Sequence, residues 1–160
     1  MTILGAEFYM KTVNIDGKDV RMQIWDTSGQ ERYRAIAPSF IRKAKGVILT
    51  YSIDDRKSFQ HVEDWMSQIQ AHADKDISIV LVGNKMDLPN RVVEYAEGEK
   101  LADNYNVKFF ETSAKDGTNI EEAFTLLAKD MRTKLIIDEP VSNTNRLSVK
   151  PQPKPSGGCC

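Results

Sequence analysis

A carboxylate, a glycine and an amide stand together at Asp26-Thr27-Ser28-Gly29-Gln30, directly after an alternating apolar segment. A carboxylate in this position can hold Mg²⁺, usually through a water molecule. A glycine lets a backbone N–H approach a terminal phosphate, and Gln30 is suited to orienting an attacking water. Asp26-x-x-Gly29 is a short pattern that ordinary turns after strands also produce, so its weight depends on the motifs that follow it.

Two further polar segments, Asn84-Lys85-Met86-Asp87 and Thr112-Ser113-Ala114-Lys115, have the chemistry of a purine-base site. A carboxylate can accept the N1–H and the exocyclic amine of guanine, a pair of donors that adenine lacks. A lysine stem can lie along the base plane, and a small residue lets a backbone N–H reach the base carbonyl. Each segment alone also suits a polar turn. For all three motifs in this order, the chance of a coincidental match falls to roughly one in a hundred. The candidate base-binding residues are Asn84, Lys85, Asp87, Ser113, Ala114 and Lys115.

The phosphate-binding loop G-x-x-x-x-G-K-[S/T], which should precede such motifs, does not occur in these 160 residues. The one Gly-Lys pair, Gly17-Lys18, is followed by Asp19, and no glycine stands five residues before it. The amides and lysine of that loop would surround the β and γ phosphates. We therefore expect nucleotide binding and hydrolysis by this chain to be impaired.

Size and composition indicate one domain followed by a tail. The 160-residue chain has a formal charge of −1, which argues against a general nucleic-acid surface. No apolar run reaches the ~18 residues of a membrane span. The apolar periodicity stops near Ile137, and Pro, Ser, Asn and Lys dominate the sequence from there. We assign residues 1–136 to the globular domain and 137–160 to a flexible tail.

Apolar periodicity predicts the elements that must position these motifs. Glu7–Ile15 and Val20–Trp25 are expected to form an antiparallel hairpin around Asp16-Gly17. Nearly continuous apolar runs predict three parallel strands covered on both faces, at Gly46–Tyr51, Ile77–Val82 and Val107–Phe110.

Helices are expected to alternate with these parallel strands. Helical stripes are predicted between Ser58 and Ala73, around Ala96–Tyr105, and from Ile120 to Leu135. Thr118 and Glu121 have the spacing of a capping box at the start of the last helix. Alternation of strands and helices predicts an α/β layered domain. Such folds bind ligands at the carboxyl ends of their strands.

The chain resembles a Rab-type member of the Ras-like small GTPases. The family segment W-D-T-A-G-Q-E-R-[FY]-R is matched from Trp25 to Arg34, with Ser28 for the usual Ala, and the guanine motifs are matched from Gly83 and Glu111. The resemblance implies a P-loop NTPase fold, three-layered, whose mostly parallel sheet has one antiparallel edge strand. Here the first strand, phosphate loop and first helix are missing. That strand would lie in mid-sheet, between Val20–Trp25 and Gly46–Tyr51, so two strand edges should be unpaired.

The family resemblance also implies roles for individual residues. GTP or GDP and Mg²⁺ would be the ligands, Gln30 the catalytic residue, and Asp26 a metal ligand through water. Thr2 is the nearest counterpart of the family's Mg²⁺-binding threonine, although Thr2-Ile3-Leu4-Gly5 is one residue longer than the family's T-I-G. Effectors would read two switch segments, whose candidate residues are Gly5, Ala6, Glu7, Phe8, Arg32, Tyr33 and Arg34.

The final residues, Cys159 and Cys160, follow Gly157-Gly158 and resemble the doubly geranylgeranylated Rab terminus. Two lipid chains give stable membrane anchoring where one is marginal, although an incidental exposed thiol pair is the alternative. The resemblance implies a monomer at the cytoplasmic face of intracellular membranes, with a cytosolic pool. Its partners would be exchange factors, activating proteins, effectors, an escort protein and a dissociation inhibitor.

Two functional hypotheses follow. In the first, the chain belongs to a GTP/GDP-dependent, membrane-anchored switch in vesicle trafficking whose intact form continues upstream of Met1. In the second, it is a nucleotide-independent, lipidated binding module that occupies Rab partners. The retained segments Gly5–Phe8 and Gln30–Pro38 motivate the second hypothesis.

Overall fold

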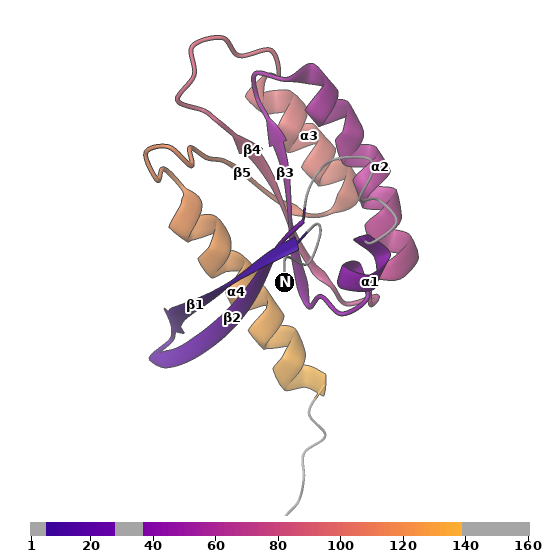
Figure 1. Cartoon of the computed structure of the whole chain (residues 1–160), viewed down its shortest axis with the longest axis vertical. Coiled ribbons are helices and arrows are strands. Elements are labelled where there is room, and N and C mark those ends of the chain that lie inside the picture. Colours follow the sequence, from indigo (N-terminus) through magenta and orange to yellow (C-terminus); the bar gives the residue numbers. More distant parts are fainter. Residues whose placement is uncertain (1–5, 28–36, 139–160) are drawn as a thin grey trace, which may run out of the picture.

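The computed structural model describes residues 6–27 and 37–138, which form two β-sheets and four helices (Figure 1). In chain order the elements are β1 (Ala6–Ile15), β2 (Lys18–Thr27), α1 (Ala37–Ile41), β3 (Gly46–Ser52), α2 (Arg56–His72), β4 (Ser78–Asn84), α3 (Tyr95–Tyr105), β5 (Lys108–Glu111) and α4 (Ile120–Asp138).

The predicted hairpin is confirmed. β1 and β2 pair antiparallel, with Ile15 opposite Lys18 at the turn. Asp16 and Gly17 connect the strands with φ values of 52° and 76°, the left-handed conformation that a tight hairpin turn requires. The sequence predicted that this strand ends at Trp25 and that Asp26 lies in the loop after it. β2 instead runs two residues further, so Asp26 lies within the strand.

The three predicted parallel strands are also confirmed. They form one sheet in the order β3-β4-β5, and Leu49 lies in register with Leu81 and Phe109. Alternate side chains point to opposite faces, because side chains along a strand alternate. One face carries Leu49, Tyr51 and Leu81, and the other carries Val80 and Val82.

Helices cover both faces of this sheet, which makes three layers. Val62, Met66 and Ile69 of α2 pack with Leu101 and Ala102 of α3 on one face. On the other face, Ala123 and Leu127 of α4 pack on β4 (Figure 1). The parallel and antiparallel parts of the fold therefore share a common helix, α4, because the hairpin packs on it too.

The hairpin is not joined to the parallel sheet by strand pairing. Within the described ranges 6–27 and 37–138, β2 pairs with β1 alone and β3 pairs with β4 alone. This agrees with the expectation that a strand is missing between them. The hairpin instead packs Val13, Ile15 and Met22 against Ala128 of α4. Arg132 also donates to the carbonyl of Ile15 at 2.9 Å.

Two local details differ from the sequence predictions. The capping box at Thr118 and Glu121 is wrong: α4 begins at Ile120, and the Thr118 hydroxyl donates to the Asp116 carboxylate at 2.6 Å. Asn119 separates Thr118 from the helix and takes a left-handed φ of 58°. The short helix α1 was not predicted, because its five residues are too few to show a helical stripe.

Among the described helices, none combines the length and the apolar composition that a membrane crossing requires.

Candidate functional site

The two predicted base-binding segments meet at the carboxyl ends of β4 and β5. Asn84 is the last residue of β4, and Thr112 directly follows β5. The backbone N–H of Thr112 donates to the carbonyl of Gly83 at 2.9 Å, and Met86 N–H donates to the carbonyl of Thr112 at 3.0 Å. These bonds extend the ladder of the parallel strands into the two loops, so the sheet itself sets their relative position.

The Asn84 side chain joins the same two loops. Its Oδ1 accepts from the Thr112 hydroxyl at 3.1 Å and from the backbone N–H of Ala114 at 3.0 Å. One amide oxygen therefore fixes both the buried and the exposed part of the Thr112–Lys115 segment. The role of Asn84 is thus to shape the site, through its oxygen.

Asp87 is held by the segment that follows β5. The Ser113 hydroxyl, which is fully buried, donates to Asp87 Oδ1 at 2.7 Å. Asp87 Oδ2 has a more distant contact, 3.8 Å from the Lys115 ammonium, and the carboxylate side chain is 15% exposed. One oxygen is therefore occupied, and the other keeps acceptor capacity for a ligand's N–H groups.

Tight turns bring Ser113 and Lys115 into place. The N–H of Ser113 donates to the carbonyl of Thr118 at 3.1 Å, and Gly117 N–H returns to the carbonyl of Ser113 at 2.9 Å. Gly117 has a φ of +86°, which a glycine adopts without the strain of a side chain. Asp116 accepts from the Thr118 hydroxyl at 2.6 Å and from the Thr118 N–H at 2.9 Å, and these two bonds lower the pKa of the Asp116 carboxyl. The segment is thus a closed loop whose outer residues face solvent.

A partly buried ion pair fixes the chain downstream of Asp87. Arg91 makes two bonds to the Glu111 carboxylate, Nη1 to Oε1 at 2.5 Å and Nη2 to Oε2 at 2.7 Å. Glu111 ends β5, and its side chain is 8% exposed. The bond to Glu111 raises the pKa of the Arg91 guanidinium. This bidentate geometry holds the loop after Asp87 against the strand that leads to Ser113.

Lys85 lies at the edge of the site in an unusual conformation. Its φ is 70°, which few non-glycine residues adopt. Its ammonium lies 3.3 Å from Oδ1 of Asp54, a residue just beyond β3. Sequence reasoning missed Asp54, because nothing in the spacing of residues 54 and 85 shows that β3 and β4 place them together.

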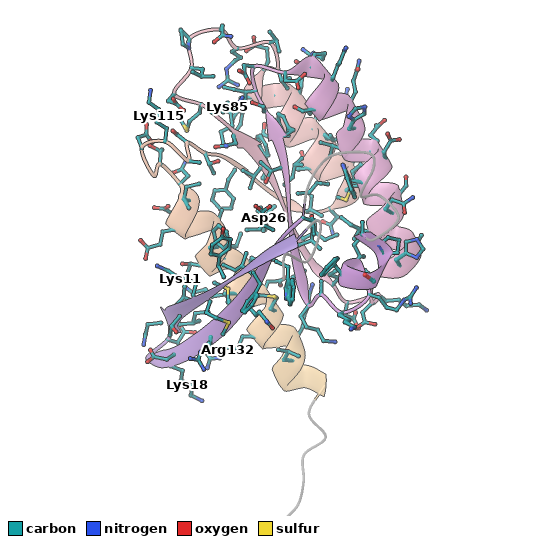
Figure 2. The ribbon with its side chains drawn as sticks, in the orientation of Figure 1. Lys11, Lys18, Asp26, Lys85, Lys115 and Arg132 are labelled. Atoms are coloured by element: carbon teal, nitrogen blue, oxygen red, sulfur yellow. The ribbon has the colours of Figure 1, made fainter. Side chains whose placement is uncertain are left out.

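Asp26 does not join this group. It lies exposed on β2, and none of the hydrogen bonds or ion pairs described for residues 6–27 and 37–138 links it to the loops after β4 and β5. Figure 2 shows Lys85 and Lys115 near one another and Asp26 on the hairpin, apart from both. The structure therefore brings together the residues that the sequence predicts to bind the base, and it does not bring Asp26 to them.

Several predicted site residues lie outside the described ranges, namely Thr2, Gly5, Gly29, Gln30, Arg32, Tyr33, Arg34, Cys159 and Cys160. Ala6 and Glu7 belong to β1, but their side chains are not described, whereas Phe8 is 54% exposed.

The residues predicted to bind the base lie at the carboxyl edge of the sheet. A cavity of about 220 Å³ lies at the opposite, amino ends of the strands, where Lys45, Ile77 and Leu135 line it. It contains none of the predicted site residues, so geometry and chemistry point to the loops after β4 and β5 instead.

Comparisons with known proteins agree with this assembly. The family profile described as the Ras family matches residues 1–133. The chain is 47% identical over 137 residues to "GTP-binding protein yptV2" of Volvox carteri, an alignment that covers 84% of this chain and 63% of the relative. It is 41% identical over 158 residues to "Ras-related protein Rab-8B" of Dictyostelium discoideum, covering 98% of this chain and 77% of the relative.

A third relative, "Ras-related protein Rab-8B" of Pongo abelii, is 46% identical over 136 residues, covering 84% of this chain and 66% of the relative. The chain thus spans slightly less than two thirds of the Volvox and Pongo relatives that it matches. The guanine-type loops after β4 and β5, the α/β architecture and these identities lead to one conclusion: the chain belongs to the Ras family of small GTPases and is a Rab-type member of it.

Proposed function

We propose that this chain recognises guanine nucleotides through Asp87 and belongs to a GTP/GDP-dependent, membrane-anchored switch of vesicle trafficking. The carrying observation is the geometry of the Asp87 carboxylate. Ser113 holds one oxygen at 2.7 Å, and the other oxygen is left beside the Ala114–Lys115 segment with acceptor capacity.

Guanine fits this arrangement better than adenine. The carboxylate would accept the N1–H and the exocyclic amine of guanine, whereas adenine offers no such pair and leaves a desolvated carboxylate unpaired. Lys85 would lie along one face of the base, and the small Ala114 keeps the loop close to the base edge. Asn84 would hold both loops at the correct separation through its two hydrogen bonds.

The phosphate end of the nucleotide would be held by few groups of this chain. The 160 residues hold no G-x-x-x-x-G-K-[S/T] loop, and Asp26 is the one described candidate for a Mg²⁺ ligand through water. Each lost charge-assisted contact costs about 1.5–3 kcal/mol, so several together weaken binding by orders of magnitude. We propose that this chain by itself binds GTP weakly and hydrolyses it slowly, with Gln30 as the residue that orients water.

Three aromatic rings support binding of protein partners. Phe8 and Trp25 lie with ring centroids 5.3 Å apart, and Trp25 and Phe40 lie 5.4 Å apart. Phe8 is 54% exposed and Trp25 is 42% exposed. A contiguous group of partly exposed aromatic rings is typical of a surface that binds a partner. Here it joins the hairpin, next to the proposed effector segment Gly5–Phe8, to α1.

Membrane attachment would come from Cys159 and Cys160, each carrying a geranylgeranyl group. The domain of residues 1–136 would then be tethered by residues 137–160 at the cytoplasmic face of an intracellular membrane. An escort protein, a dissociation inhibitor, exchange factors and activating proteins are the proposed regulators.

Titration of the purified 160-residue chain with fluorescently labelled GTP and GDP tests the proposed site. We expect weak, saturable binding that unlabelled GDP displaces and ADP does not. Binding that lacks any base preference would contradict the proposed site, and tight binding would contradict the expected loss of the phosphate grip.

The aromatic group also favours a second function, that of a nucleotide-independent module that occupies Rab partners. Immobilised wild-type chain and a Trp25→Ala variant would be incubated with a purified Rab escort protein. Retention by the wild type that is independent of added nucleotide and lost in Trp25→Ala would support this second function, and no retention would reject it.

A further inference from the structure

Asp54 and Lys85 meet although 31 positions separate them in the sequence, with the ammonium 3.3 Å from Oδ1 of Asp54. The Ser52 hydroxyl donates to the same carboxylate oxygen. The register of the parallel strands explains the meeting, because Ser52 at the end of β3 lies opposite Asn84 at the end of β4. Asp54 is two residues beyond Ser52, and Lys85 is one residue beyond Asn84. Both therefore emerge from neighbouring strands at the same edge of the sheet.

The backbone around Asp54 is anchored to the site. The N–H of Ile53 donates to the carbonyl of Asn84 at 3.0 Å, and the carbonyl of Ile53 accepts from Val92 and Val93 at 2.9 and 3.0 Å. Ile53 is fully buried, and the Asp54 side chain is 19% exposed. The backbone next to Asp54 is thus fixed, so its carboxylate can hold a neighbouring cation in a defined position.

Lys85 is constrained at both ends as a result. Its left-handed φ of 70° sets the direction in which the side chain leaves the backbone, and Asp54 holds the ammonium. A lysine stem loses rotamer freedom when a ligand orders it, so an ammonium that is already held reduces the entropy lost when a ligand binds.

We propose that Asp54 is a positioning residue for Lys85, which it holds so that the aliphatic stem lies along the face of a bound purine base. This inference rests on the proposed guanine site. Asp54 would act on the face of the base, whereas Asp87 acts on its edge. Loss of Asp54 should therefore weaken guanosine and inosine nucleotides equally, because inosine has the same ring face and lacks only the exocyclic amine.

Affinities of GDP and IDP for four variants test this proposal: Asp54→Asn, Lys85→Met, the double variant, and the control Asp74→Asn. Asp74 pairs with Lys45 at 3.0 Å near the amino end of β3, remote from the site. We expect Asp54→Asn to weaken both nucleotides about two- to fivefold with an unchanged ratio between them, as for a partly exposed ion pair. In the Lys85→Met background it should have no further effect, and Asp74→Asn should bind as the wild type does.

Asp54→Asn that binds both nucleotides like the wild type, or that changes the GDP/IDP ratio, would overturn the proposal. An Asp54→Asn effect of the same size in the Lys85→Met background would also overturn it, because Asp54 would then act independently of Lys85.

A ligand-free measurement separates this proposal from the proposed function. Carbon-13 relaxation of Lys85 Cε should show greater motion in Asp54→Asn than in the wild type or Asp74→Asn. If the wild-type chain binds no guanine nucleotide, the proposed function fails. The relaxation measurement still tests whether Asp54 restrains the Lys85 side chain. A Lys85 side chain that moves equally in all three proteins would overturn the inference.

Discussion

The side-chain oxygen of Asn84 accepts a hydrogen bond from the backbone N–H of Ala114 at 3.0 Å, and this bond connects loops that follow two different strands. The same oxygen accepts from the hydroxyl of Thr112, which is 1% exposed. The relationship matters because Asp87 and Ser113 lie on those two loops. Their 2.7 Å hydrogen bond depends on the separation that Asn84 sets.

Asn84→Ala should therefore destabilise the protein and weaken guanine binding together. The substitution leaves the buried Thr112 hydroxyl without its acceptor, which costs about 1–3 kcal/mol. Urea denaturation monitored by circular dichroism measures the loss. Asn90→Ala, in the exposed loop nearby, serves as the control and should change the unfolding free energy little. Equal stabilities of the two variants would refute the role of Asn84.

Glu97 should give the protein a specific acid sensitivity. The Arg56 guanidinium, which bonds to its carboxylate at 2.6 Å, and the backbone N–H of Glu94 lower the pKa of Glu97 to about 2 from 4.5. A carboxyl whose pKa is lowered by folding stabilises the folded state above its unfolded pKa, and this stabilisation is lost as pH falls through the folded pKa. The window of loss is thus from 4.5 down to about 2.

The stability difference between wild type and Glu97→Gln should shrink as the pH falls across that window. Urea midpoints of both proteins at about pH 6 and about pH 3 measure it. Glu99→Gln, an exposed residue on the same helix, should show no such trend. A difference that stays constant with pH would mean that the Arg56–Glu97 pair contributes nothing through ionisation.

Gly98 should resist the substitution that normally stabilises a helix. Alanine exceeds glycine in helix propensity by about 1 kcal/mol. At position 98, however, an added Cβ would lie 2.4 Å from both the Tyr51 hydroxyl and the ring of Phe109. Overpacking of this kind costs about 1–3 kcal/mol, so Gly98→Ala should lower the melting temperature. Glu99→Ala controls for helix propensity, and a stabilised Gly98→Ala would contradict the packing at Tyr51.

The edge of β3 that faces away from β4 should promote self-association, since no strand within residues 6–27 and 37–138 pairs with it. The strand Gly46–Ser52 carries no charge or proline to block pairing with another chain. Thr50→Lys, at an exposed position on this strand, should reduce concentration-dependent association measured by sedimentation velocity. Gln60→Lys adds the same charge on α2 and should have no effect; equal behaviour of both variants would argue against the open edge.

Local sequence signals predicted the elements better than the contacts between them. Asp16-Gly17 placed the hairpin, and the uncharged runs from Gly46 and Ile77 identified buried parallel strands, because turn chemistry and burial on both faces act on neighbouring residues. The two guanine-type loops met as expected, since parallel strands bring their carboxyl ends to one edge.

Contacts that depend on register and loop path could not be predicted in this way. The Arg91–Glu111 pair and the Asp54–Lys85 pair each join residues at least 20 positions apart. Helix ends were also missed: Asn119 intervenes before α4, so Thr118 bonds to Asp116. Periodicity has no information on which strands are neighbours or on the conformation of a single residue before a helix.

Competition between GDP and ADP on the wild-type chain and on Asp87→Asn tests the guanine site most directly. The wild type should prefer GDP by about a hundredfold or more. Asp87→Asn should lose that preference, because an amide has an NH2 group in place of one carboxylate oxygen and cannot accept a guanine N–H group on each of its two terminal atoms. Asp103→Asn, an exposed acid on α3, should retain it. An Asp87→Asn chain that still prefers GDP as strongly as the wild type would contradict the account.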